Sequence, residues 1–107
     1  MYELVLKNGN RIQIAQNDFA NQCNWLEAKL RCEEIGEGWR LPTISELEEI
    51  FERKENFEFA NYGFWAYWSI EEINENQSLA FSGVDVEGTT ITELKEAEFY
   101  IRAVKNI

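Results

Sequence analysis

The sequence predicts an α+β domain in which two helices flank a twisted antiparallel sheet. Three observations favour this class: alternating segments at the start of the chain, two consecutive helical patterns after them, and strand-like segments from there to the end. Helices and strands that are grouped in this way, and not alternated, indicate an antiparallel sheet. The 107 residues are 45% hydrophobic and 14% aromatic, which is enough for one domain over residues 1–107 with one core.

The chain begins with a predicted β-hairpin. Residues 2–6 and 11–15 alternate between apolar and polar side chains, and Asn8-Gly9 lies between them. An Asn-Gly pair between two such segments is a strong local hairpin signal. We also expect the first and last strands of the chain to lie close together and to be able to pair.

Residues 24–35 are predicted to form the first helix. Asn24 is a suitable N-cap, and Gly36 suits the position just after the last helical turn. The apolar residues recur at the spacing of one helix face. They are Trp25, Ala28, Cys32 and Ile35, with Leu26 and Leu30 broadening the stripe.

The second helix is expected from about residue 44 to 54. Thr43 and Glu46 have the spacing of a capping box, in which each side chain accepts from the other residue's backbone amide. Glu49 and Arg53 are spaced to form a favourable ion pair on the helix surface. The side chains expected to point inward are Leu47, Ile50 and Phe51.

The second half of the chain reads as strands joined by polar loops. Residues 64–70 are dense in aromatic side chains and favour a strand, and residues 71–77 form a polar loop. Residues 78–86 and 99–104 are predicted strands. Residues 87–98 are ambiguous, because their first part favours a strand and their second part is compatible with one helical turn.

These elements and the residues at their junctions resemble the C-type-lectin-like fold, and more narrowly its bacterial Lcl-type C-terminal domain family. The hallmark of that family is a Trp-Arg-Leu-Pro-Thr motif, which residues 39–43 match. Weaker matches occur in the same order as in that family. They are Trp25, Ala28 and Cys32 before the motif, and Glu46-Leu47 and residues 67–69, 80–83 and 100–105 after it. The resemblance covers residues 25–105 and implies a bacterial or phage origin and a function carried by loops.

The sequence also departs from that family. Lectin-like domains often join the first helix to the last strand by a disulfide, and Cys32 has no partner because residues 99–107 contain no cysteine. The proline-containing triplet and the Trp-Asn-Asp segment of calcium-dependent lectins are missing. The related formylglycine-generating enzymes use a cysteine pair late in the chain, whereas both cysteines are early here. Neither calcium-dependent sugar binding nor that catalysis is therefore expected.

The residue types of common catalytic and metal sites are scarce. The chain has no histidine, so a Ser-His or Cys-His nucleophile cannot form. Cys23 and Cys32 do not complete a zinc site without two more soft ligands. Asp85 and Glu87 offer oxygen ligands for calcium, but a strand end exposed to water is the simpler interpretation. We expect no catalysis, no cofactor and no metal.

The charge and the apolar pattern bear on partners and location. With 20 acidic and 10 basic residues, the net charge is −10, and no Lys/Arg cluster exists to neutralise phosphates. Direct nucleic-acid binding is therefore not expected. No leader and no apolar run of membrane-spanning length is visible, so we expect no membrane association and a cytoplasmic protein with two reduced thiols. Cys32 should be buried and slow to react, and Cys23 faster.

The candidate binding residues follow from the aromatic strand. Strict alternation places Trp68 on the core face and turns Trp65 and Tyr67 toward solvent, a partner or a second packing layer. Exposed Trp and Tyr are typical binding anchors, and the next loop offers a polar rim. Arg40 and Arg102 are either interface residues or, more commonly, members of internal ion pairs. The predicted partner-binding residues are Trp65, Tyr67, Glu71, Glu72, Asn74, Glu75 and Asn76.

Three functions remain open at this point. The first is a non-catalytic module that binds a protein partner, in an oligomeric state that the sequence does not reveal. The second is an acidic, nucleic-acid-mimicking inhibitor of phage type that occupies a basic groove of a host protein. The third and weakest is a divergent carbohydrate or small-ligand binder. Scattered acids favour the first, acids lined on one face the second, and an open pocket beside Trp65 and Tyr67 the third.

Overall fold

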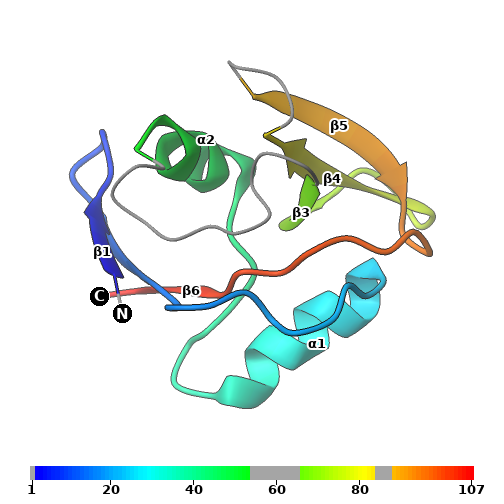
Figure 1. Cartoon of the computed structure of the whole chain (residues 1–107), viewed down its shortest axis with the longest axis horizontal. Coiled ribbons are helices and arrows are strands. Elements are labelled where there is room, and N and C mark those ends of the chain that lie inside the picture. Colours follow the sequence, from blue (N-terminus) through cyan, green and yellow to red (C-terminus); the bar gives the residue numbers. More distant parts are fainter. Residues whose placement is uncertain (1, 54–65, 84–87) are drawn as a thin grey trace.

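The computed structural model of the chain describes residues 2–53, 66–83 and 88–107. These residues form an α+β domain with two helices and two antiparallel sheets of three strands, whereas one sheet was expected (Figure 1). One sheet has the order β1-β2-β6 and the other β3-β4-β5. The elements are β1 (Tyr2–Val5), β2 (Arg11–Ile14), α1 (Trp25–Ile35), α2 (Ile44–Glu52), β3 (Ala66–Glu72), β4 (Gln77–Ser82), β5 (Thr89–Leu94) and β6 (Val104–Asn106).

The predicted hairpin is confirmed. β1 and β2 pair antiparallel, and the Leu6 amide donates to the Asn10 carbonyl across the turn at 2.8 Å. Gly9 has a φ of 92°, a left-handed conformation that glycine adopts without strain. β6 pairs with β2 and not with β1, so the prediction that the terminal strands can pair is wrong. They share a sheet, but the hairpin partner of β1 lies between them.

Both helices begin as their caps predicted. The Asn24 side chain accepts from the Glu27 amide at 2.9 Å at the start of α1, and Gly36 follows the helix with a φ of 83°. At the start of α2 the capping box is complete. The Glu46 amide donates to the Thr43 hydroxyl at 3.1 Å, and the Thr43 amide donates to the Glu46 carboxylate at 2.8 Å. The capping residues Asn24 and Thr43 therefore define where both helices begin.

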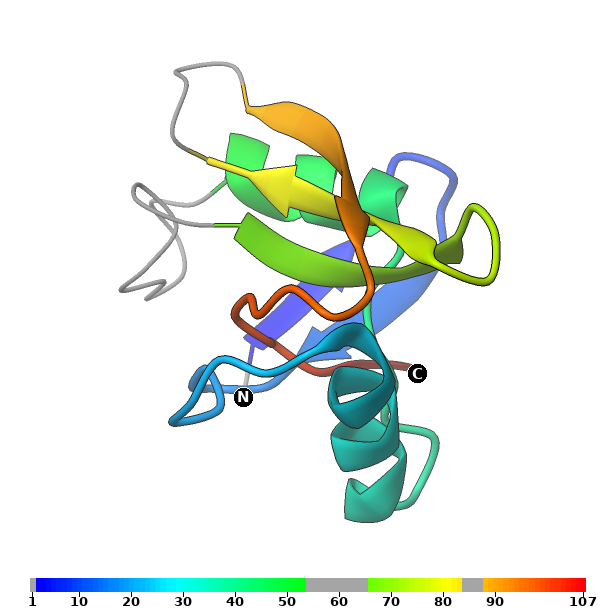
Figure 2. The ribbon, with the colours of Figure 1, turned by 90° about the vertical axis from the view of Figure 1, so that its right-hand side faces the viewer.

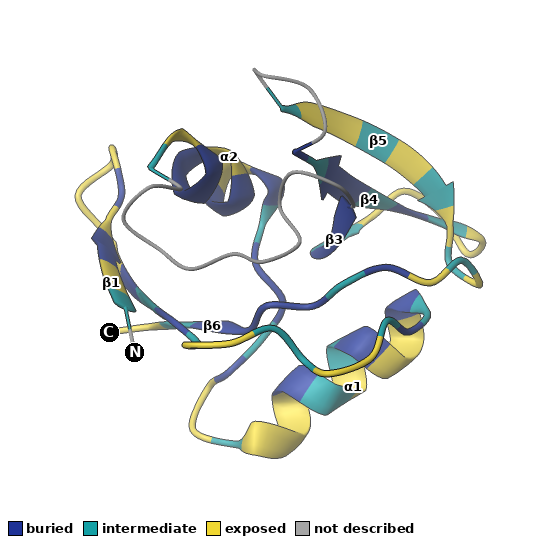
Figure 3. Ribbon diagram, viewed as in Figure 1, coloured by how far each residue is buried: buried dark blue, intermediate teal, exposed yellow. Residues whose placement is uncertain are grey.

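Two expectations about the helix surfaces are wrong. The buried stripe of α1 is narrower than predicted, because Leu26, Leu30 and Ile35 are 57%, 47% and 48% exposed. The face that packs inward is narrow, and the outer face of α1 stays open to water (Figure 3). The expected Glu49–Arg53 pair on α2 is replaced by contacts to the hairpin. Glu49 accepts from the Lys7 amide at 2.8 Å, and Arg53 donates to the Val5 carbonyl at 3.1 Å.

Residues 95–103 lead from β5 in one sheet to β6 in the other, and we call them the crossing segment. The predicted last strand at 99–104 is therefore wrong over most of its length. Its residues pair one at a time with different neighbours, so no continuous ladder forms. The bridges join Phe99 to Cys23, Tyr100 to Tyr67, and Val104 to Arg40. Figure 2 shows the crossing segment passing between the sheet β3-β4-β5 and α1. The only regular strand here is the short β6 that follows.

β3 and β4 are covered on both faces, and each face of the sheet belongs to a separate core. One core joins it to α2 and the sheet β1-β2-β6 through residues such as Tyr67, Phe81, Leu47, Ile50 and Ile14. The other joins it to α1 and the crossing segment through residues such as Trp68, Ala80, Ala28, Cys32 and Ile101. Neither helix of the described residues is long and apolar enough to cross a membrane.

Candidate binding surface

The aromatic strand β3 is core and does not form a binding surface over its described residues. Tyr67 is fully buried, and its hydroxyl donates to Asp18 Oδ2 at 2.6 Å. Trp68 is also fully buried and donates from its indole nitrogen to the Cys23 carbonyl at 2.9 Å. The sequence correctly placed Tyr67 and Trp68 on opposite faces of β3, but the face that carries Tyr67 packs against other parts of the protein. The placement of Tyr67 on a partner-binding surface is therefore wrong, and Trp65 lies outside the described residues.

A buried ion pair holds Tyr67 in place. Arg102 is 2% exposed, and its Nε donates to Asp18 Oδ1 at 2.6 Å, while its Nη1 donates to the Ala15 carbonyl at 2.9 Å. The pair thus links the chain after β2, the strand β3 and the crossing segment. Arg102 is an internal ion-pair residue, the second of its two predicted roles. Asp18 was missed, because it lies in a polar connection without any periodic pattern.

Arg40 belongs to a second ion pair, at the junction that carries the Trp-Arg-Leu-Pro-Thr motif. Its Nη1 and Nη2 donate to the two carboxylate oxygens of Glu46, each at 2.8 Å, and Nη2 also donates to Asn106 Oδ1 at 2.7 Å. Burial alone would raise the pKa of Glu46, but the hydrogen bonds from Arg40 and Thr43 outweigh it, so this pKa lies below its ordinary value. The motif therefore serves the fold, by joining the start of α2 to β6.

The β3–β4 turn keeps the polar candidate residues at the surface. Asn74 orders the turn, because its Oδ1 accepts from the amides of Asn76 at 2.8 Å and Gln77 at 2.9 Å. Glu72, Asn74, Glu75 and Asn76 are exposed, and Glu71 is half-buried. Five of the seven predicted residues are thus brought together, two at the end of β3 and three in the ordered turn that follows it.

Two exposed apolar residues beside this turn were missed by the sequence reading. Ile73 is 47% exposed and its amide donates to the Gln77 carbonyl, while Gln77 lies directly opposite Leu94, which is 50% exposed. Residues directly opposite one another in a sheet share a face and lie within side-chain contact. Ile73, Gln77 and Leu94 therefore form one row that runs from the residue after β3 across β4 to β5. The sequence signal was weak: one apolar residue at the start of a polar loop and one before Lys95.

A shallow hollow of about 280 Å³ adjoins this row, lined by Glu75, Asn76, Leu94, Lys95 and Glu96. Lys95 is held in place, because its Nζ donates to Glu72 Oε2 at 2.5 Å and lies 4.7 Å from the centre of the Trp25 ring. The same hydrogen bond lowers the pKa of Glu72 below its ordinary value. We call the row and its surroundings the tip surface. It comprises Glu72, Ile73, Asn74, Glu75, Asn76, Gln77, Leu94, Lys95 and Glu96.

The thiols are poor candidates for chemistry. Cys23 and Cys32 are both buried free thiols, which confirms the predicted burial of Cys32. Burial raises the pKa of Cys23 to about 11 and that of Cys32 to about 12. At neutral pH both are almost entirely protonated, and the thiolate is the reactive form. Within the described ranges, no group of His, Cys, Asp or Glu residues is arranged to hold a metal ion. Asp85 and Glu87 lie outside them.

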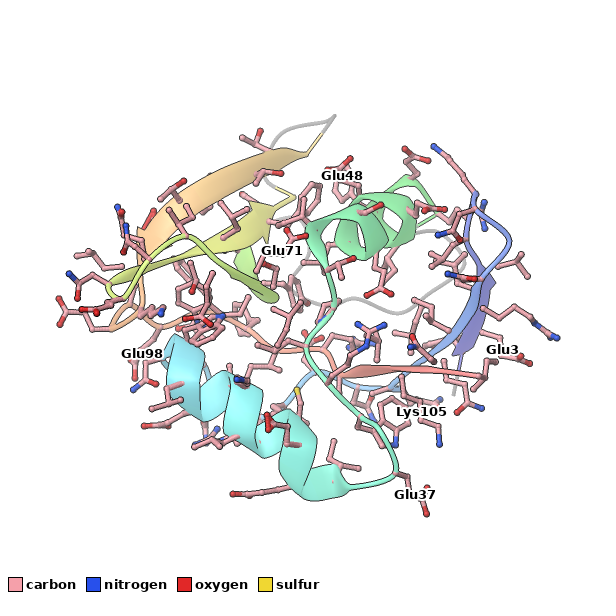
Figure 4. All side chains as sticks on the ribbon, turned by 180° about the vertical axis from the view of Figure 1, so that it is seen from behind. Glu3, Glu37, Glu48, Glu71, Glu98 and Lys105 are labelled. Atoms are coloured by element: carbon pink, nitrogen blue, oxygen red, sulfur yellow. The ribbon has the colours of Figure 1, made fainter. Side chains whose placement is uncertain are left out.

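The acidic side chains of the described residues are distributed over several sides of the domain. Figure 4 shows Glu3, Glu37, Glu48 and Glu98 on different sides of the domain, carried by different elements. No family model matches the sequence, and a search of the curated proteins found no match. The candidate surface is therefore defined by its own geometry.

Proposed function

We propose that this domain is a non-catalytic module that binds a protein partner through the tip surface. The observation that carries the proposal is the row of Ile73, Gln77 and Leu94. It places two half-exposed apolar side chains on either side of Gln77, with acids and amides around them. An apolar centre inside a polar rim is the usual anatomy of a protein-binding patch. The ordered turn below it lowers the entropic cost of binding.

The resemblance to the C-type-lectin-like fold supports this reading. Two helices, antiparallel sheets and a junction motif that joins α2 to the last strand are compatible with that fold. We propose that the domain is a divergent member of it, of bacterial or phage origin, that acts in the cytoplasm. Two buried free thiols are consistent with a reducing compartment. In such a fold the core is constant, and the loops carry the binding specificity.

The scattered acids favour the binding module over the nucleic-acid mimic. A mimic needs its charges lined on one face, whereas the exposed glutamates of the described residues lie on several faces (Figure 4). The ligand-binding alternative needed an open pocket beside Tyr67, and this residue is buried. The hollow at the tip surface is shallow and suits one side chain of a partner better than a whole sugar.

The test is capture of a partner by matched variants. Wild-type protein, immobilised, is used to capture binding proteins from cells that produce it, and the partner is identified by mass spectrometry and purified. Ile73→Ser should weaken binding by about tenfold, because loss of an apolar anchor typically costs about 1–2 kcal/mol. Ile35→Ser is the matched control, since Ile35 is 48% exposed at the far end of α1. Equal loss in both variants, or in neither, would contradict the proposal.

A further inference from the structure

The outer edge of β5 differs from the other edge of its sheet. At the β3 edge, the Trp68 amide donates to the Tyr100 carbonyl at 3.1 Å, and the Ile70 amide donates to the Pro42 carbonyl at 2.8 Å. β5 is the opposite end of the strand order β3-β4-β5. Among residues 2–53, 66–83 and 88–107, none pairs with its outer edge between Thr90 and Glu93.

The register shows which backbone groups point outward. The Lys95 amide donates to the Asn76 carbonyl at 2.8 Å, so this opposite pair is a hydrogen-bonded one. In an antiparallel ladder, hydrogen-bonded and non-bonded pairs alternate. Moving back along β5 from Lys95, every second residue is therefore bonded to β4. Ile91 and Glu93 direct their backbone groups to β4, and Thr90 and Thr92 direct theirs to the outer edge.

The neighbouring strand gives an independent check on this assignment. Leu79 lies directly opposite Thr92. Its carbonyl accepts the Ser69 hydroxyl of β3 at 2.7 Å, so it points away from β5. Thr92 thus has no bond to Leu79, and its amide and carbonyl face outward. Together with Thr90 it presents two donors and two acceptors in the pattern that an added strand requires.

β5 also lacks the features that usually protect a sheet edge. Proteins guard exposed edges with prolines, lysines, bulges or very short strands. The six residues of β5 contain no proline and no lysine, and all six pair with β4 without a register shift. By contrast, the pairing of β3 with β4 shifts between Trp68 and Glu72. β5 is exposed along most of its length (Figure 3).

The charges around β5 select the chemistry of its occupant. Glu93, Glu96 and Glu98 lie on the strand or in the turn that follows it, and Glu75 lines the hollow. Two cations lie nearby: Lys95 is already paired with Glu72, and Lys29 Nζ lies 5.7 Å from the centre of the Trp25 ring, so the acidic side chains still outnumber the cations here. An incoming segment with lysine or arginine is therefore attracted, whereas an acidic one is repelled. A second copy of this chain is disfavoured too, since each carries a net charge of −10.

We infer that the outer edge of β5 binds an extended, basic segment of a partner protein as a fourth strand of the sheet. This inference rests on the proposed function, because it gives the partner of the tip surface a binding mode and a charge. The backbone groups of Thr90 and Thr92 bond the added strand. One of its side chains enters the hollow beside Leu94, where Glu75 and Glu96 face it.

The test uses a fluorescent, capped peptide of alternating lysine and valine, with a glutamate and valine peptide as its control. Binding is followed by anisotropy and by amide chemical shifts of the full chain. Thr92→Pro removes an outward donor that makes no bond to β4, which the fold should tolerate. It should weaken binding of the basic peptide by about tenfold. Thr92→Ala keeps the donor and should bind as wild type. Ile91→Pro, which removes a ladder bond, should destabilise the sheet.

The expected result is binding of the basic peptide alone, with the largest shift changes at the amides of Thr90 and Thr92. Three results of the peptide experiment would overturn the inference: no binding, equal binding of the acidic peptide, or shift changes located on another element. The shift map of the wild type decides the matter even where Thr92→Pro fails to fold. Self-association of the free protein through β5 would equally overturn it. If Ile73→Ser, but not Ile35→Ser, still weakens partner binding in any of these cases, the proposed function stands and only the β5 mode is wrong.

Discussion

The two edge strands of the sheet β3-β4-β5 have opposite compositions and opposite environments. β3 carries Tyr67 and Trp68, both fully buried, and its edge is closed by the crossing segment and by Pro42. Half of the residues of β5 are threonines, and the strand is exposed along its open edge. The sequence favoured the aromatic strand as the binding surface, and it left residues 87–98, which contain β5, as an ambiguous segment. High aromatic content therefore indicated a buried strand that several segments cover, and not a surface that is open to a partner.

The largest effect should come from the thiols that lie beneath the closed edge. Cys23 pairs through its backbone with Phe99, and both Cys23 and Cys32 are buried with a raised pKa. We expect each to react with a thiol reagent at pH 8 about a hundredfold or more slowly than in the urea-unfolded chain. Timed labelling with mass spectrometry measures this for each residue. Rapid labelling of Cys23 in the native protein would show that the closed edge opens easily.

Asp18→Ala should have the largest effect on stability. It leaves the buried guanidinium of Arg102 without its carboxylate, which typically costs about 3–5 kcal/mol. The free energy of unfolding, from urea denaturation, measures the loss. Glu3→Ala is the control, because the Glu3–Arg11 pair is exposed at 55% and 59% and should contribute less than about 1 kcal/mol. Similar losses in both variants would mean that burial does not distinguish the two pairs.

Tyr67→Phe should have a smaller effect. It removes one hydrogen bond to the Asp18 carboxylate, and hydrogen bonds to charged groups contribute about 1.5–3 kcal/mol. Partner binding through the tip surface should be unchanged, since Tyr67 does not reach the surface. Denaturation and partner affinity are measured on the same sample. A stable variant that has lost its partner would restore Tyr67 as a binding residue.

The junction at residues 40–43 closes the far end of β3 and should be sensitive to acid. The pKa of Glu46 is lower in the folded chain than in the unfolded chain. The ionised Glu46 therefore contributes its full stabilisation of the fold at pH values above its unfolded pKa of about 4.3. That contribution is lost as the pH falls through the lowered folded pKa. Glu46→Gln should therefore cost about 1–2 kcal/mol at pH 7, where it weakens the bonds from Arg40, and much less at pH 2.5.

Urea denaturation at the two pH values tests this pair. Glu72→Gln is the control, because the pKa of Glu72 is also lowered but its side chain is exposed, so solvent screens its bond to Lys95. The control should show a smaller change between the two pH values. If Glu46→Gln lowers the free energy of unfolding equally at both pH values, the effect comes from packing and not from the charge of Glu46.

The cap and turn signals were predicted correctly from the sequence, and the long-range pairings were not. The caps at Asn24 and Thr43 and the turn at Gly9 depend on neighbours within a few residues, so their patterns are visible in the chain. The Asp18–Arg102 pair joins residues 84 positions apart, and no spacing rule connects them. The closure of the β3 edge by residues 99–101 is of the same kind. It also explains why the predicted last strand was misplaced.

The candidate site was predicted in part for the same reason. The turn from Glu71 to Asn76 is local, and its polar composition identified it as a surface loop. The tip surface depends in addition on Leu94, which is brought beside Gln77 only by the register of β5 on β4. The open edge at Thr90 and Thr92 is a property of strand order, which the sequence does not display. Tyr67 was misplaced because alternation assigns a face but does not say whether that face is covered.

The smallest perturbation concerns the open edge itself. Thr92→Ala should change the free energy of unfolding by less than about 0.5 kcal/mol, because this exposed side chain packs little. Hydrogen exchange should show the edge directly, without any substitution. The amides of Ile91 and Glu93 bond to β4 and should exchange slowly, whereas those of Thr90 and Thr92 point outward and should exchange much faster. On β3 no such alternation is expected, since both its edges are bonded. Equal protection of all four β5 amides would show that something already covers this edge.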